Sequence, residues 1–236
     1  MTPSSQDGHA RVVLGILGAH NLIQNTLLNE KGYVGGNLAI SATLVVIGRQ
    51  SGATWEEMGL SVRHAHSSLR AGGMIAAAAA AGAVAGIAHP RLRVLLSEGR
   101  TRIGGDENIL NRILIRFPIG TALFEEVAFR GVLPATIGGG RWRTDLLSAG
   151  AFAVWHLIPT SRVQGGVSQD WPFHRRVAVV IGGSVAAGVA GLGLSWLRRR
   201  TGGLLAPWLV HATVNSSMFL ASELARGMSD DPTTRS

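Results

Sequence analysis

The amino-acid sequence contains no cysteine, a single lysine and few charged residues of any kind. The absence of cysteine excludes disulfide bonds and metal sites with cysteine ligands. Asp, Glu, Lys and Arg make up only 15% of the 236 residues, whereas a soluble domain carries roughly 25%. Hydrophobic residues make up 46% of the chain. The composition therefore indicates a polytopic helical membrane protein rather than a soluble protein with a large core.

The net charge of +8 comes almost entirely from arginine, because Lys31 is the only lysine. The arginines lie between apolar segments instead of forming one stripe, a distribution typical of contact with anionic lipid headgroups. We therefore expect membrane lipids as partners and no nucleic acid. The expected location is the plasma membrane of a bacterium, as an integral, multi-pass protein. The sequence leaves the oligomeric state open.

The apolar segments predict an all-α fold, a polytopic transmembrane bundle of about seven to eight membrane helices around a polar intramembrane cavity. One membrane-embedded domain is expected over residues 12–222, with its core at about 109–220, between polar tails at 1–11 and 223–236. The expected spans are 12–28, 33–48, 69–88, an interrupted segment at 109–133, a short element at 146–157, 177–196 and 204–220.

Three connections between these segments also have a predicted character. Residues 54–60 are expected to form a short interfacial helix with Thr54 as its N-cap, because threonine is a preferred capping residue. A basic loop is expected at 91–107 and a polar loop at 159–176.

Two adjacent carboxylates, Glu125 and Glu126, stand with Arg130 inside the apolar segment at 109–133. Charges are costly in a lipid environment, and those that are kept usually line a water-filled cavity. Glu126 and Arg130 are four residues apart and share a helix face, so we expect a structural ion pair. Glu125 then points about 100° away and stays available as a base. An idle, solvated glutamate pair at a helix end is the alternative.

Two further polar clusters lie in later apolar segments. Phe152 lies one helical turn before His156, so it can form the wall of a cavity beside that histidine. His211 and Asn215 again have the spacing that presents both side chains on one helix face. Each cluster alone also fits hydrogen bonding between helices. Together with an available carboxylate, the two histidines and the asparagine indicate an active site.

The ordered motifs Glu-Glu-x-x-x-Arg, Phe-x-x-x-His and His-x-x-x-Asn resemble those of the CPBP (CAAX protease and bacteriocin-processing, Abi) family of intramembrane endopeptidases. The resemblance covers roughly residues 124–215. It implies that Glu125 is the general base that activates water, with His156 assisting. It also implies that His211 and Asn215 stabilise the oxyanion formed on the scissile carbonyl.

The resemblance further implies that Glu126 and Arg130 hold the architecture of the site. It leaves two forms of catalysis open. We expect no cofactor and a mechanism that depends on the glutamate. The alternative is one divalent metal ion, Zn²⁺, bound by Glu125, His156 and His211 with one position left for water.

The expected function is therefore that of an intramembrane endopeptidase, which hydrolyses a peptide bond in a membrane-associated peptide or protein, as in CAAX processing. The alternative is a non-catalytic membrane peptide-binding or bacteriocin self-immunity protein of the same fold, which loss of a motif residue would favour. A transporter also keeps ionisable residues within the membrane, but the absence of internal repeats argues against one.

Overall fold

The computed structural model of the protein describes residues 3–98, 108–167 and 171–230. Within these ranges the chain is helical and contains no strand, as predicted. The elements are α1 (Pro3–Thr26), α2 (Glu30–Gln50), η1 (Val62–His64), α3 (Ala65–Ala88), α4 (Pro90–Glu98), α5 (Ile109–Asn111), η2 (Arg112–Leu123), α6 (Phe124–Glu126), η3 (Val127–Val132), α7 (Leu133–Thr136), α8 (Arg141–Trp155), α9 (Leu157–Val167), α10 (Phe173–Thr201) and α11 (Leu205–Asp230).

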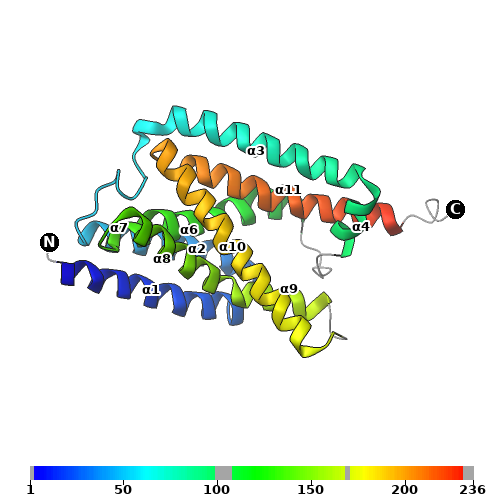
Figure 1. Ribbon diagram of the computed structural model, residues 1–236, viewed down its shortest axis with the longest axis horizontal. Helices are drawn as coiled ribbons and strands as arrows, with labels where there is room; N and C mark the ends of the chain where they lie inside the picture. The colour runs from blue at the N-terminus through cyan, green and yellow to red at the C-terminus, as the bar shows by residue number, and fades with distance from the viewer. Residues whose placement is uncertain (1–2, 99–107, 168–170, 231–236) are drawn as a thin grey trace.

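The helices pack as a bundle in which α3 and α11 lie side by side along one edge and α1 lies along the opposite edge (Figure 1). The α10 helix crosses the bundle diagonally and packs against α8. The α2 and α11 helices both pack against η2, and the buried part of the segment from α5 to α7 is its second half.

Small residues let several of these helices approach closely, as the glycine-rich composition leads one to expect for a membrane bundle. A Cβ atom added at Gly72 in α3 would lie 2.7 Å from the Cα atom of Ala206 in α11. A Cβ atom at Gly188 in α10 would lie 3.0 Å from the Cβ atom of Ala153 in α8. Larger side chains at these glycines would force the paired helices apart.

The interrupted apolar segment predicted at 109–133 forms one run of helix from Ile109 to Thr136. Over η2 and η3 its hydrogen bonds have the wider i→i+5 spacing of a π-helix, with α6 between them. Wide turns of this kind are rare and often occur at functional sites. Pro118 lies within η2 and cannot donate a backbone hydrogen bond. The centre of the hydrophobic core is the second half of this run, from Phe124 to Leu133, where every side chain is buried.

Several predicted loops and tails are helical instead. The α1 helix begins at Pro3 and α11 continues to Asp230, so most of each predicted polar tail extends a helix. The α4 helix occupies the start of the predicted basic loop, and the rest of that loop, 99–107, lies outside the described residues. The α9 helix occupies the start of the predicted polar loop at 159–176. The loop predictions were wrong at these positions because polar residues end an apolar pattern without ending the helix, whereas the division into one domain and two polar tails stays a prediction.

The interfacial helix predicted at 54–60 is a series of turns. Its capping chemistry is nevertheless present, because the Thr54 hydroxyl accepts from the N–H of Glu57 at 3.1 Å. In return, the Glu57 carboxylate accepts from the N–H of Thr54 at 2.7 Å. These reciprocal bonds form a capping box. Gly59 ends the turn with a φ of +69°, a conformation that favours glycine, and so prevents a helix from continuing.

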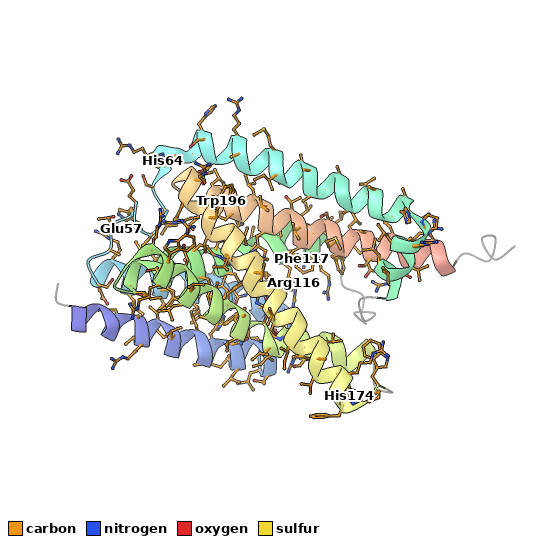
Figure 2. All side chains as sticks on the ribbon, viewed as in Figure 1. Glu57, His64, Arg116, Phe117, His174 and Trp196 are labelled. Carbon is orange, nitrogen blue, oxygen red and sulfur yellow. The ribbon has the colours of Figure 1, made fainter. Side chains whose placement is uncertain are left out.

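Two helices in the described part of the chain are long and apolar enough to cross a membrane, Val62–Ala88 and Phe173–Thr201. The second runs from His174 at one end of the molecule to Trp196 near the other (Figure 2). Only 11% of its apolar window is buried inside the protein, so most of its apolar side chains face outward. Such a surface fits lipid better than water. The count of seven to eight membrane helices stays a prediction.

Candidate active site

The two adjacent glutamates form the centre of a buried polar cluster. Glu125 is 5% exposed and Glu126 is fully buried, both within α6. His211 of α11 faces both of them. Its Nδ1 atom lies 2.7 Å from Oε1 of Glu126, and its Nε2 atom lies 3.5 Å from Oε2 of Glu125. One imidazole therefore bridges the two carboxylates.

The ion pair predicted between Glu126 and Arg130 is present, with 3.2 Å between Nη1 of the arginine and Oε1 of the glutamate. Both side chains are almost completely buried. The guanidinium carbon of Arg130 also lies 3.9 Å from the ring centroid of Phe152, a cation–π distance. Glu126 thus has two partners on Oε1, Arg130 and His211, whereas its Oε2 is buried without a hydrogen bond from the described residues.

Glu125 is held by a different set of partners. The indole Nε1 of Trp155 donates a hydrogen bond to Oε1 of Glu125 at 3.0 Å. The other oxygen, Oε2, is buried and accepts no hydrogen bond from the residues that the structure describes. One oxygen of Glu125 is therefore anchored, and the other is left with His211 as its polar neighbour. The two oxygens of this carboxylate therefore have different environments.

Trp155 was not among the predicted site residues, although its neighbour His156 was. A buried indole usually finds an acceptor for its N–H, so a tryptophan within an apolar segment could have been predicted to contact a buried carboxylate. The backbone carbonyl of Trp155 in turn accepts a hydrogen bond of 3.0 Å from Nδ2 of Asn21 in α1. The first helix therefore helps to position the donor to Glu125.

A second contribution from the N-terminal helices comes from His20 and Asn37. Nε2 of His20 lies 2.5 Å from Oδ1 of Asn37, and Nδ2 of Asn37 donates to the carbonyl of Gly120 at 2.7 Å. The ring of His20 also contacts Phe124, next to Glu125, with 5.3 Å between centroids. These contacts attach α1 and α2 to the glutamate-bearing helix.

His156 lies at the junction of α8 and α9, where it is the C-cap of α8. Its Nδ1 atom donates to the backbone carbonyl of Phe152 at 2.9 Å, which leaves Nε2 as the free position of the ring. Phe152 packs edge-on against His156 at 4.4 Å between centroids and lies 6.2 Å from the ring of His211. The predicted cavity wall therefore lies between the two histidines.

Asn215 is half-buried one helical turn after His211 on α11, as the spacing predicted. Two long-range hydrogen bonds hold α11 against η2. The indole of Trp208 donates to the carbonyl of Pro118 at 2.8 Å, and the hydroxyl of Ser216 donates to the carbonyl of Ile113 at 2.8 Å. These bonds bracket His211 and Asn215 and fix their helix beside the glutamates.

The residues of the zinc alternative do not converge on a common point. Among the described residues, no three His, Cys, Asp or Glu side chains are placed so that they could hold a metal ion. His156 is turned toward the carbonyl of Phe152, and both nitrogens of His211 face the glutamates. These three side chains are therefore not placed to bind one zinc ion together.

Comparison with known proteins assigns part of the chain to a family. Residues 108–217 match the family described as "Type II CAAX prenyl endopeptidase Rce1-like". No curated protein and no solved structure matches the chain. The matched segment contains the glutamates, both histidines and the asparagine described above. This match agrees with the family predicted from the motifs, and residues 108–217 are similar to a family of membrane-embedded proteases.

Proposed function

We propose that this protein hydrolyses a peptide bond in a membrane-associated peptide or protein, with Glu125 as the general base and no metal ion. The observation that carries the proposal is the state of the Glu125 carboxylate. Trp155 anchors one of its oxygens, whereas the other is buried without a hydrogen bond from the described residues. A base that is fixed in place and only half satisfied is suited to take a proton from water. Glu126 also has one unbonded oxygen, but it is paired with Arg130, which makes it the weaker base.

The proposed reaction begins when Oε2 of Glu125 removes a proton from a water molecule. The resulting hydroxide adds to the carbonyl carbon of the peptide and forms a tetrahedral oxyanion. Collapse of this intermediate breaks the C–N bond, and Glu125 returns its proton to the leaving amine. The products are one carboxylate and one amine, so no oxidant or further reactant is required.

The remaining residues of the cluster have supporting roles in this proposal. Glu126 accepts from Nδ1 of His211 and keeps that imidazole beside Glu125, as a carboxylate commonly does for a functional histidine. Asn215 supplies an amide donor for the oxyanion. His156, with Nδ1 bonded to a backbone carbonyl, presents a basic Nε2 that assists proton transfer.

A cleavage assay on the purified full chain in lipid vesicles tests the proposal. A fluorogenic peptide that ends in a CAAX sequence is supplied with and without a prenyl group, because the family name includes prenyl substrates. Wild-type protein should cleave at least one of the two peptides, and Glu125→Gln should reduce the rate by about 10³-fold. Glu56→Gln, which changes an exposed glutamate, is the matched control and should keep full activity.

The same assay separates the metal-free mechanism from the zinc alternative. Wild-type protein is treated with a chelator, its metal content is measured, and its activity is assayed without added metal. Full activity in a sample without bound metal is expected. Activity that disappears on chelation and returns with Zn²⁺ would contradict the metal-free mechanism, and cleavage by Glu125→Gln at the wild-type rate would contradict the role of Glu125.

A further inference from the structure

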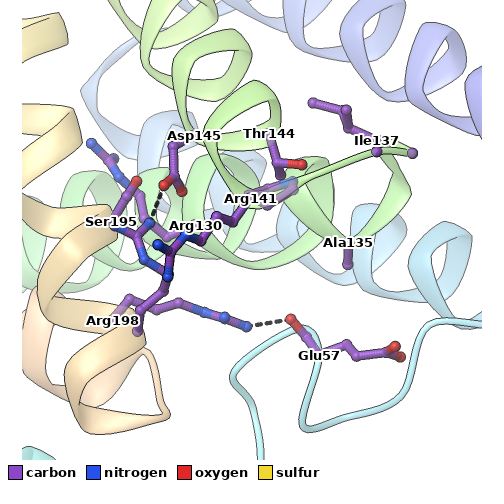
Figure 3. Close-up of a pocket in the computed structure, with 13 residues that line it drawn as sticks. Glu57, Arg130, Ala135, Ile137, Arg141, Thr144, Asp145, Ser195 and Arg198 are labelled. Carbon is purple, nitrogen blue, oxygen red and sulfur yellow. Dashed lines mark hydrogen bonds and ion pairs between the residues drawn. The ribbon is translucent and has the colours of Figure 1, made fainter.

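Arg130, the partner of Glu126, also lines a cavity outside the glutamate cluster, with a volume of about 380 Å³ (Figure 3). This cavity lies where the loop between α7 and α8 meets the C-terminal end of α10. Its polar lining includes the glycines of the loop between α7 and α8 and several arginines. Besides Arg130, the lining includes Gly138, Gly139, Arg141, Asp145, Ser195 and Arg198.

The lining carries more positive than negative charge. Four arginines contribute to it, Arg130, Arg141, Arg198 and Arg199, against two acidic residues, Glu57 and Asp145. Both acidic groups already have partners. Asp145 forms an ion pair with Arg199, and the Glu57 carboxylate accepts from the N–H and the hydroxyl of Thr54. Arg130 is paired with Glu126 outside the lining, so the excess positive charge comes from Arg141 and Arg198 against Glu57.

Two of the arginines have buried donor groups without a hydrogen bond. The Arg130 side chain is 1% exposed, and its Nη2 has no partner although Nη1 is bonded to Glu126. Nε of Arg198 is also buried without a partner, while Nη2 of that residue donates to the carbonyl of Glu57. A guanidinium can only donate, and an unsatisfied buried donor costs free energy. What these groups lack is an acceptor, best supplied by an anion.

The N-terminus of α8 adds further donors at the same cavity. Its N-cap, Gly140, provides no side-chain cap, and the first turn contains no acidic residue, so no side chain neutralises this end of the 15-residue helix. Gly139 has a φ of +105°, which lets the loop turn into the helix. A glycine loop that leads into a helix N-terminus is a common anion-binding arrangement.

Three exposed tryptophans lie close in the sequence to residues that line the cavity. Trp55, Trp142 and Trp196 are 51%, 66% and 52% exposed. Each lies within two residues of a residue that lines the cavity, namely Glu57, Arg141 and Ser195. Tryptophan is enriched at the level of the lipid headgroups. Glu57 and Trp196 lie toward the same end of the bundle, far from His174 (Figure 2).

We infer that this cavity binds a phosphate group, and that the phosphate is supplied by the headgroup of an anionic phospholipid. The unpartnered donors and the helix N-terminus match a phosphate, the excess positive charge favours an anionic headgroup over a zwitterionic one, and the neighbouring tryptophans are typical of the headgroup level. The inference does not depend on the proposed peptidase activity. It assigns Arg130 two contacts, one with Glu126 and one with the lipid phosphate.

A binding experiment with the full chain in neutral detergent tests the inference. Short-chain phosphatidylglycerol, short-chain phosphatidylcholine and inorganic phosphate are titrated separately, and the unfolding temperature and tryptophan fluorescence are recorded. Phosphatidylglycerol should raise the unfolding temperature with a saturable dependence, phosphatidylcholine should have little effect, and inorganic phosphate should compete with the lipid at much higher concentration.

Two arginine variants make the result specific to the cavity. Arg141→Gln changes an exposed residue and should fold normally, yet its affinity for phosphatidylglycerol should fall by about tenfold or more, as expected for a lost charge-assisted hydrogen bond. Arg91→Gln, which changes an exposed arginine on α4, is the matched control and should bind as the wild type does.

Three outcomes would overturn the inference. Equal responses to phosphatidylglycerol and phosphatidylcholine would show that the cavity does not select an anionic headgroup. Equal losses in Arg141→Gln and Arg91→Gln would show that the lipid responds to surface charge in general. Binding of inorganic phosphate as tight as that of the lipid would assign the cavity to a free phosphate.

Discussion

The run of helix from Ile109 to Thr136 and the α10 helix are about equally long, but they differ in which side chains they expose. The first carries two glutamates and three arginines, and Glu125, Glu126 and Arg130 among them are almost completely buried. The second is apolar along most of its length, and its large side chains, such as Val185 and Val189, are more than half exposed. The charged helix is interior and the apolar helix is exterior.

This difference in exposure is what a lipid environment favours. Lipid does not penalise exposed apolar side chains, whereas a charge in the membrane must face a partner or a cavity. In this protein the partners come from other helices, Trp155 from α8 and His211 from α11. Hydropathy therefore identifies the helix that faces lipid, and buried polarity identifies the helix that carries the proposed chemistry.

The largest effect on stability is expected at Arg130. Arg130→Met removes the buried partner of Glu126 and should lower the free energy of unfolding by about 3–5 kcal/mol. Chemical denaturation in detergent measures the change. The double variant Glu126→Gln, Arg130→Met should recover part of the loss, because no buried charge is then left alone. If Arg130→Met were as stable as the wild type, the buried ion pair would not be needed to keep the charged helix in the interior.

A smaller effect, on activity, is expected at Trp155. Trp155→Phe keeps an aromatic ring in the core but removes the donor to Glu125, so turnover should fall by about tenfold to a hundredfold. The unfolding temperature should change little. Trp171→Phe, at a residue that stacks with Arg175 instead, is the control and should leave turnover unchanged. Equal activity of the two variants would mean that the indole does not position the carboxylate.

The α10 helix contacts the charged helix at Gly191. A Cβ atom at Gly191 of α10 would lie 2.9 Å from Nη2 of Arg130 and 3.1 Å from the ring of Phe152. Gly191→Ala should therefore destabilise the protein by about 1–3 kcal/mol. A Cβ atom at Gly182 on the same helix meets nothing within 4 Å, so Gly182→Ala should be within about 0.5 kcal/mol of the wild type. Thermal unfolding of both variants compares the interior and exterior faces of α10 directly.

The smallest effect is expected outside both helices, at Glu57. Hydrogen bonds from Thr54 hold the pKa of Glu57 below its usual value. A carboxylate with a lowered pKa stabilises the fold above its unfolded pKa, and this contribution is lost as the pH falls through the folded pKa. Thr54→Val should raise the pKa of Glu57, measured by NMR titration, with little change in unfolding temperature at neutral pH. An unchanged pKa would mean that the Thr54 hydroxyl has no influence on the carboxylate.

Local spacing explains why part of the site could be predicted. The pair of Glu126 and Arg130 follows from a four-residue interval, which has the same meaning in any helix. The shared face of His211 and Asn215 follows from the same rule. The family match over residues 108–217 was likewise predictable, because it rests on motifs that are short and ordered along the chain.

Contacts between distant segments could not be predicted in this way. The hydrogen bond from Trp155 to Glu125 spans 30 residues, and the bond from Asn21 to Trp155 spans 134. Both depend on how α1 and α8 pack against the glutamate helix. In the sequence, His20 and Asn21 only interrupt an apolar run. The wide turns of η2 and η3 also have no reliable sequence signal, although Pro118 marks one of them.

The central claim is that the adjacent glutamates have different roles, Glu125 as the general base and Glu126 as the partner of Arg130 and His211. It is tested most directly when turnover and thermal unfolding are measured side by side for Glu125→Gln and Glu126→Gln. Glu125→Gln should lose about 10³-fold in turnover with an unchanged unfolding temperature, whereas Glu126→Gln should also unfold at a lower temperature. Normal turnover by a folded Glu125→Gln protein would contradict the account.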